Sequence, residues 1–144
     1  MWSDTLLLAE RSALIRLALW GAASVVAGTG LFAVLAVRRQ RSALLDGFAL
    51  QSVVWGTVGL ARVVDGMAAL VPRDAAAAMR LERWVWVLTG LDVGLAGVGV
   101  TMAVTGWVLG RRFGVVGAGI GIFVQGAALF ALDARFATIL NRLV

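Results

Sequence analysis

Three polar residues stand inside long apolar stretches of the sequence: Gln51, Asp92 and Gln125. Asp92 lies nine residues after Arg83, which is roughly 13 Å along a helix that rises 1.5 Å per residue. In a bilayer with an apolar core about 30 Å thick, that distance places Asp92 near the midplane, and both glutamines lie at comparable depth. An ionised carboxylate there costs at least about 2.5–3.5 kcal/mol, so Asp92 must be protonated, paired or exposed to water.

Two kinds of chemistry fit these residues. In the first, the buried amides and the carboxylate hydrogen-bond to one another and fix how the helices pack, because an unpaired polar group in hydrocarbon is costly. In the second, Asp92 takes up and releases a proton, or binds a cation or a cationic solute. Helical spacing adds two members on the same faces, so the candidate buried polar cluster consists of Gln51, Trp55, Asp92, Gln125 and Asp133.

Several residue types on which enzymes and metal sites depend are missing. The sequence contains no Cys, no His and no Tyr. There is therefore no thiolate nucleophile, no iron–sulfur cluster, no His-ligated zinc and no Ser-His-Asp triad. No nucleophile–base pair is visible either, which ranks an enzyme acting on lipids last among the alternatives. We expect no catalytic residues, no cofactor, no metal site and no enzymatic activity.

The composition is that of a membrane protein. Hydrophobic residues make up 61% of the chain and charged residues 15%, whereas soluble domains are about 45–50% apolar and about 25% charged. The 13 basic residues are all arginines and lie at the ends of apolar stretches, where they orient helices and meet lipid head groups rather than nucleic acid. Arginine without lysine, with abundant Ala, Gly and Val, is typical of a GC-rich bacterial genome. We therefore expect a multi-pass protein of the bacterial inner (cytoplasmic) membrane.

Four apolar stretches predict an all-α protein: a single membrane domain over residues 1–144, built as an up-down-up-down bundle of four transmembrane helices. The expected helices span residues of about 12–38, 43–70, 74–110 and 113–140. Residues 3–16 form an amphipathic lead-in, and the connection between the second and third helices is expected to be a helical hairpin in water. Tryptophans are expected near the membrane interfaces, at Trp2, Trp20, Trp84, Trp86 and Trp107. Arginine counts do not choose between the two orientations.

Rows of small residues mark the faces on which the last two helices approach their neighbours. The row on the fourth helix contains Gly117, Gly121, Gln125, Leu129 and Asp133, and the row on the third contains Asp92, Ala96, Gly99, Ala103, Gly106 and Gly110. Small residues at such spacing let transmembrane helices pack closely, within one chain or between two copies. An offset of 73 residues superimposes Gly21 on Gly94 and one arginine turn on the other, which suggests two repeated helical hairpins.

Three segments resemble a family of small uncharacterised bacterial membrane proteins with four helices. They are Gly47-Phe48-Ala49-Leu50-Gln51-Ser52-Val53-Val54-Trp55-Gly56, Leu91-Asp92-Val93, and Gln125-Gly126 with the following Asp133. The family motifs are F-x-x-Q-x-x-x-W-G, N-x-G-L-D and Q-G with a later Asp. The Asn of the family motif is absent from this segment, and no Tyr follows Asp92. The resemblance implies that the five candidate residues form one polar centre, and it carries no assigned activity.

Two functions follow from these observations. The first is a non-enzymatic structural or accessory subunit of the membrane, whose polar cluster is architectural. The alternative is an oligomeric transporter or channel for a small solute or ion, with Asp92 as the coupling carboxylate. The expected partners are the lipid bilayer and either a second copy or another membrane protein. Ion pairs are expected around the end of the bundle that carries the termini, among Arg11, Arg16, Arg62, Asp65, Arg80, Glu82, Arg83, Asp133 and Arg135.

Overall fold

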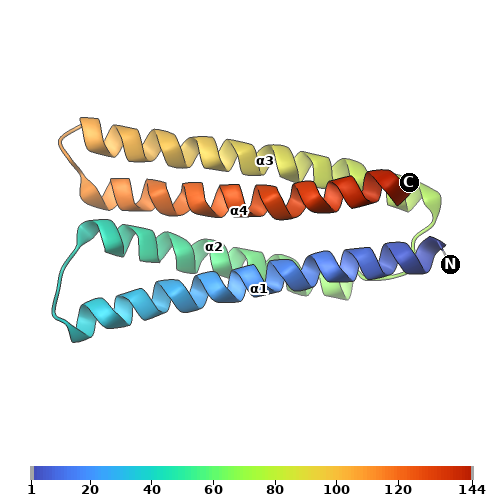
Figure 1. Cartoon of the computed structure of the whole chain (residues 1–144), viewed down its shortest axis with the longest axis horizontal. Helices are drawn as coiled ribbons and strands as arrows, with labels where there is room; N and C mark the ends of the chain where they lie inside the picture. Colours follow the sequence, from blue (N-terminus) through green and yellow to red (C-terminus); the bar gives the residue numbers. More distant parts are fainter. Residues whose placement is uncertain (1, 144) are drawn as a thin grey trace.

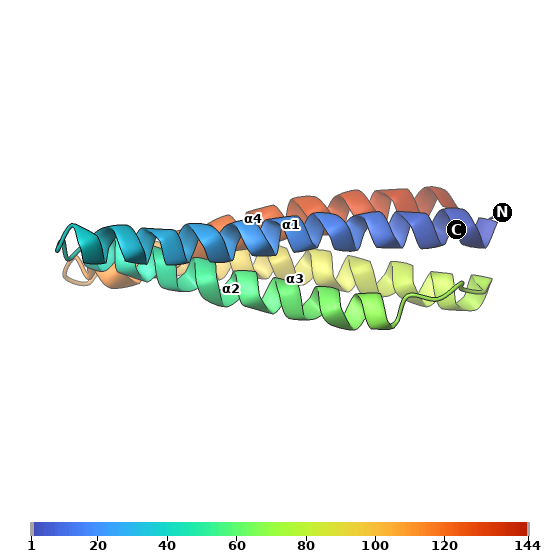
Figure 2. The same cartoon turned by 90° about the horizontal axis from the view of Figure 1, so that it is seen from below.

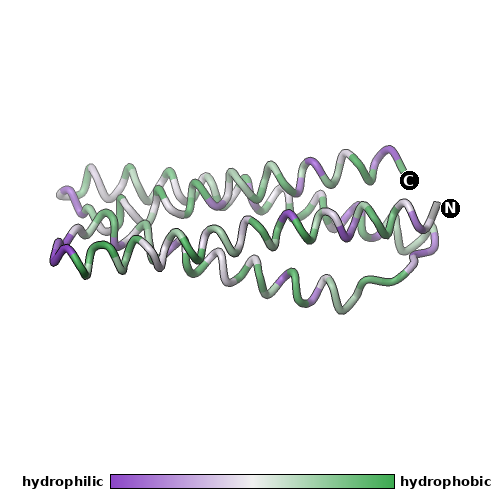
Figure 3. The backbone as a smooth tube through the Cα atoms, turned by 60° about the horizontal axis from the view of Figure 1, so that its bottom comes forward, coloured by the Kyte–Doolittle hydropathy of each residue, from purple (hydrophilic) through white to green (hydrophobic). Residues whose placement is uncertain are grey.

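The computed structural model describes residues 2–143, and in these residues all regular structure is helical. Four helices follow one another: α1 (Trp2–Val37), α2 (Ala43–Ala68), α3 (Ala75–Val108) and α4 (Phe113–Leu143). Each is long and apolar enough to cross a membrane. Hydrophilic residues gather at the two short connections at one end and around the termini at the other (Figure 3). The expected all-helical fold with four apolar helices is thus confirmed.

Polar side chains start two of the helices. Ser42 accepts a hydrogen bond from the Leu45 backbone N–H at 3.4 Å, and Asp74 accepts one from the Ala77 N–H at 2.7 Å. These caps satisfy backbone donors that have no partner within the first helical turn. At the α3–α4 connection, the Trp107 ring meets the Phe113 ring edge to face with their centroids 6.1 Å apart. The Arg111 guanidinium lies 5.5 Å from the centre of the Trp107 ring, which is a cation–π contact. Side chains from the end of α3, the turn and the start of α4 thus stabilise this short connection.

One helix start differs from its predicted position. The first helix begins at Trp2 rather than near residue 12, because the amphipathic lead-in continues without a break into the apolar stretch. The connection between α2 and α3 has helix on both sides of a short break, as expected: α2 ends at Ala68, residues 70–74 are non-helical, and α3 begins at Ala75. Pro72 lacks a backbone N–H, and Asp74 caps α3 instead of continuing α2. The side chain of Trp2 lies outside the described part of the structure.

The helices form a row rather than a closed ring. Close packing joins α3 to α4, α4 to α2 and α2 to α1, and α1 also contacts α4 over a shorter stretch. Consecutive helices run antiparallel, so α2 and α4 run in the same direction at the centre of the row (Figure 1). In the turned view, α1 and α4 lie in the upper part of the picture and α2 and α3 in the lower part (Figure 2). The non-helical segment after α2 leads to the start of α3. Within the described residues α3 therefore has one close neighbour, and α4 has three.

Glycines let the neighbouring backbones touch. A Cβ atom at Gly56 would lie 2.7 Å from the Gly21 carbonyl oxygen, and one at Gly119 would lie 2.6 Å from the Gly99 carbonyl oxygen. A Cβ atom at Gly117 would overlap the Leu44 carbonyl group, so α4 approaches α2 as closely as it approaches α3. The predicted small-residue rows are packing faces within one chain, except at Gly110, which lies beyond the end of α3 and where an added Cβ atom would meet nothing within 4 Å.

Buried apolar packing is concentrated near the termini. Here α1, α3 and α4 contribute a compact cluster that contains Leu6, Ala78, Val85, Phe136, Ala137 and Leu140. Farther from the termini, small residues and polar contacts occupy the seams instead. The candidate polar residues lie along the helices between the apolar cluster near the termini and the short connections at the opposite end.

Candidate functional site

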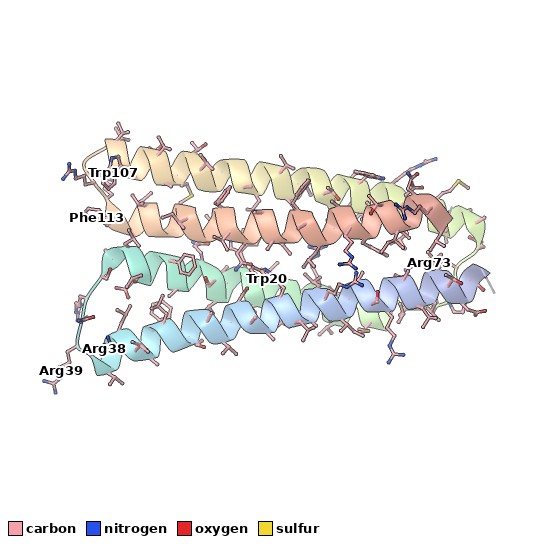
Figure 4. The ribbon with its side chains drawn as sticks, in the orientation of Figure 1. Trp20, Arg38, Arg39, Arg73, Trp107 and Phe113 are labelled. Carbon is pink, nitrogen blue, oxygen red and sulfur yellow. The ribbon has the colours of Figure 1, made fainter. Side chains whose placement is uncertain are left out.

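Gln125 joins α4 to α1 by two hydrogen bonds. Its Oε1 atom accepts from the indole Nε1–H of Trp20 at 2.8 Å, and its Nε2–H donates to the Ser24 hydroxyl oxygen at 3.1 Å. Trp20 and Ser24 are one helical turn apart on α1, so both reach the same amide. Figure 4 shows Trp20 in the space between α1 and α4. Gln125 is buried, and the two bonds give both its Oε1 and its Nε2 atom a partner.

Gln51 makes a separate contact within α2. Its Oε1 atom accepts a hydrogen bond from the Trp55 indole N–H at 3.1 Å, which confirms that these residues share a helical face. Gln51 is only half-buried, and its Cβ atom lies against Gly121 of α4. The pair thus occupies the α2–α4 seam without a hydrogen bond to Gln125.

Asp92 belongs to a third group, made of charged residues. Its carboxyl group faces that of Asp133 and interacts with the charge of Arg62. The Arg62 Nη2 atom donates to Asp133 Oδ2 at 3.1 Å, so this ion pair links α2 to α4. Asp92 is 6% exposed, and its Oδ2 atom has no hydrogen-bond partner among the described residues. Three helices therefore contribute one group of two carboxylates and one guanidinium.

The five candidate residues divide among these three groups instead of forming one hydrogen-bonded centre. The reason is the order of the helices: α2 does not pack against α3, so Gln51 and Asp92 lie on opposite sides of α4. Sequence reasoning missed Trp20 and Ser24 as partners of Gln125, because Trp20 was assigned to the membrane interface. Their spacing of four residues on a face otherwise rich in small residues was the available signal.

A cavity of about 460 Å³ lies between the four helices near the termini. Its apolar wall includes Leu17, Leu88 and Phe136, and its polar lining consists of Glu10, Arg16, Arg62, Asp65, Arg73 and Asp133. Asp92 follows Leu88 by one helical turn, so it lies just beyond the cavity lining, where it interacts electrostatically with Asp133 and Arg62. The cavity is thus mainly apolar, with charged groups along one side and a buried carboxylate beneath it.

A bidentate ion pair between Arg73 and Glu10 lines the outer side of the cavity. Arg73 donates from Nη2 to Glu10 Oε1 at 2.7 Å and from Nε to Oε2 at 3.0 Å. These bonds attach the segment between α2 and α3, where Figure 4 labels Arg73, to the N-terminal half of α1. Hydrogen bonding to Glu10 raises the pKa of the Arg73 guanidinium above its usual range. The sequence offered no signal for this pair, because its members lie 63 residues apart and Arg73 is in a connection.

Two buried hydroxyl groups bond within their own helices, and the acidic side chains of residues 2–143 do not gather in threes. The buried hydroxyls of Ser52 and Thr89 donate to carbonyl oxygens of their own helices at 3.0 and 2.8 Å. No group of three acidic side chains is placed to hold a metal ion within residues 2–143. What the arrangement offers is cross-helix hydrogen bonding, two ion pairs, and one buried carboxylate next to a cavity.

Comparison with known proteins gives one family. A family of unknown function, DUF6992, matches residues 16–134, which include all five candidate residues and Trp20 and Ser24. Comparison with curated proteins and with solved structures finds no match. The resemblance of the motif segments to an uncharacterised family is confirmed. Because the match covers well over half of its length, the chain belongs to the DUF6992 family.

Proposed function

We propose that the protein is a non-enzymatic, multi-pass protein of the bacterial inner membrane that serves as a structural or accessory subunit. The outward faces of its helices support a lipid environment, since they carry large apolar side chains such as Leu19, Val26 and Val108, each about 70% exposed. Apolar surface exposed along every helix is rare on a soluble monomer. Arginines at the two short connections and around the termini are placed to meet lipid head groups.

The observation that carries the proposal is that the polar residues between the helices act as cross-links. Gln125 connects α4 to α1, Arg62 and Asp133 connect α2 to α4, and the Glu10–Arg73 pair fixes the α2–α3 segment to α1. Hydrogen bonds of this kind set the rotation and register of helices that lipid alone would leave free. A chain whose polar groups are used in this way is suited to present a rigid surface.

The free surface of α3 is the place where a partner fits. Within residues 2–143 this helix packs closely only against α4, and Cβ atoms added at Gly90, Gly94 and Gly97 would meet nothing within 4 Å. Transmembrane helices associate through such small residues, because the backbones come close. A second copy or a different membrane protein would pack there.

Site-specific photo-crosslinking in native membranes tests the subunit role. A photoreactive residue at position 94 is expected to give one protein adduct of defined mass, whereas the same residue at Val26, on the exposed face of α1, should give lipid adducts only. Size measurement of the purified adduct separates a second copy from another protein. Lipid adducts alone from both positions would contradict the subunit role and leave membrane placement intact.

A second candidate function, transport or binding of a small cationic solute or ion, is favoured by the Oδ2 atom of Asp92. This oxygen is buried and unpartnered, and it lies next to a cavity lined by all four helices. Around the cavity, Arg62 pairs with Asp133 and Arg73 pairs with Glu10, and neither arginine makes an ion pair with Asp92. A cation that entered the cavity would find its charge partner there.

Flux measurements in proteoliposomes test this second function. Asp92→Asn keeps the shape of the side chain, so it should preserve thermal stability while abolishing uptake of an organic cation or cation-dependent stabilisation. Asp65→Asn serves as the matched control, because Asp65 is an exposed acid on the cavity lining. If the wild-type protein shows neither cation-dependent flux nor a cation-dependent shift in stability, the transport function is wrong.

A further inference from the structure

A groove on the outer surface between α1 and α4 combines two arginines with an apolar floor. It has a volume of about 550 Å³ and is lined by Arg16, Leu19, Trp20, Ala23, Ala128, Ala131, Leu132 and Arg135. The two arginines come from different helices and lie at the same end, because α1 and α4 run in opposite directions. Small alanines on both helices keep the remainder of the groove open.

The arginines of this groove lack acidic partners. Arg62 and Arg73 form ion pairs with Asp133 and Glu10, whereas neither Arg16 nor Arg135 makes an ion pair within the described residues. Two guanidinium groups beside one groove thus leave an uncompensated positive charge. Guanidinium groups bind phosphate with paired, directional hydrogen bonds, so this pair would hold an anionic phosphate group.

The depth of the groove matches that of a lipid. Arg135 follows Gln125 by ten residues, which is about 15 Å along the helix and equals half the thickness of a membrane's apolar core. Arg16 precedes Ser24, the partner of Gln125, by eight residues or about 12 Å. With Gln125 near the midplane, the Arg135 backbone lies at head-group level, and that of Arg16 lies about 3 Å deeper, a distance that its long side chain spans. Leu19, Ala23, Ala128 and Ala131 lie at the level of the acyl chains.

We propose that this groove is a binding site for an anionic phospholipid. The phosphate lies between Arg16 and Arg135, and one acyl chain runs along the alanines of α1 and α4 over the edge of Trp20. The proposal rests on the membrane placement given above and is independent of the subunit and transport roles. The lipid would fill the α1–α4 seam beside the Trp20–Gln125 hydrogen bond, so its binding would tighten the contact between these helices.

Melting experiments on the purified full-length chain in detergent test the site. Added phosphatidylglycerol should raise the melting temperature of the wild type, whereas phosphatidylcholine should not. The double variant Arg16→Gln/Arg135→Gln should lose this response, and each single variant should bind the lipid about fivefold more weakly, as expected for one charge at a lipid surface. The matched control Arg38→Gln/Arg112→Gln removes the same charge at the opposite connections and should respond like the wild type.

Several results would overturn the proposal. A groove variant that responds to phosphatidylglycerol as the control and the wild type do would show that Arg16 and Arg135 do not hold the lipid. An equal response to phosphatidylcholine would remove the role of the arginines, and stabilisation by inorganic phosphate alone would show a soluble-anion site. The melting curve of the double variant in phosphatidylcholine checks that this variant is folded. If its melting temperature there equals that of the wild type, a lost response to phosphatidylglycerol reports lost lipid binding. Failure of the wild type to insert into vesicles would instead refute the membrane placement itself.

Discussion

Replacing Gly117 with alanine places one methyl group in the tightest contact between α2 and α4. The added Cβ atom would lie 2.6 Å from the carbonyl carbon and 2.9 Å from the Cα atom of Leu44, whereas ordinary contacts begin at 3.4 Å. The atoms it meets belong to the backbone, so no side-chain rotation relieves the overlap. The two helices must separate by about 1 Å, which loosens the contacts of Gly47 and Gly121 along the same seam.

The expected destabilisation follows from two opposing effects. Forcing an extra methyl group into a packed interior costs about 1–3 kcal/mol. Alanine is favoured over glycine within a helix by about 1 kcal/mol, which offsets part of that cost. Gly94→Ala on α3 is the matched control, because a Cβ atom there meets nothing within 4 Å and gains the same helical preference. The free energy of unfolding should therefore differ between the two variants by about 1–3 kcal/mol, with Gly117→Ala the less stable.

Reversible unfolding in mixed micelles, followed by tryptophan fluorescence, measures this difference. At about 1.4 kcal/mol per factor of ten, the folded-to-unfolded ratio of the two variants should differ by about fivefold to 150-fold. Equal stabilities would refute the reasoning, since they would mean that α2 and α4 do not touch at Leu44. A Gly94→Ala variant less stable than the wild type would show that α3 packs against a partner on its outer face.

Three further predictions concern the polar contacts. Gln125→Leu should lower the unfolding free energy by about 1–3 kcal/mol and shift the fluorescence of Trp20, whose N–H loses its acceptor; an unchanged spectrum would contradict that bond. Glu10→Gln should lower the free energy of unfolding by about 1–3 kcal/mol. Because bonding to Glu10 raises the pKa of Arg73, the guanidinium stays charged at both pH 7 and pH 10, so denaturation should show the same decrease at the two pH values. Asp92→Leu should destabilise more than Asp92→Asn, since it leaves the Arg62–Asp133 pair beside hydrocarbon; equal melting temperatures would argue against contact between Asp92 and that pair.

The helices and their packing faces could be predicted because local patterns determine them. Long apolar stretches, the caps Ser42 and Asp74, and the rows through Gly99 and Gly117 depend on neighbours in sequence. Each row also faces a neighbouring helix, since small residues are useful only where another backbone comes close. Of the helix ends, only the start of α1 departs by many residues, because a weakly amphipathic segment can continue a helix at little cost.

The hydrogen-bond partners could not be predicted, because they depend on which helices are neighbours. Depth along the membrane normal placed Gln51, Asp92 and Gln125 at one level, but depth does not give their positions around the bundle. Had α2 packed against α3, Gln51 could have reached Asp92; instead α4 separates them, and α1 supplies Trp20 to Gln125. The Glu10–Arg73 pair depends on the path of a non-helical segment, which no periodicity describes.

The packing of α3 against a single neighbour has a consequence for the order of synthesis. A ribosome completes α1 and α2 first, and these helices can pair as soon as both have left it. The helix α3 comes next, yet its only close partner in the described part of the chain is α4, which follows it. Until then α3 carries Asp92 with neither Asp133 nor a packed surface beside it. A chain interrupted before residue 113 therefore exposes a helix with an unpaired carboxylate, a form suited to removal by proteases, and only the arrival of α4 gives this helix its packing partner.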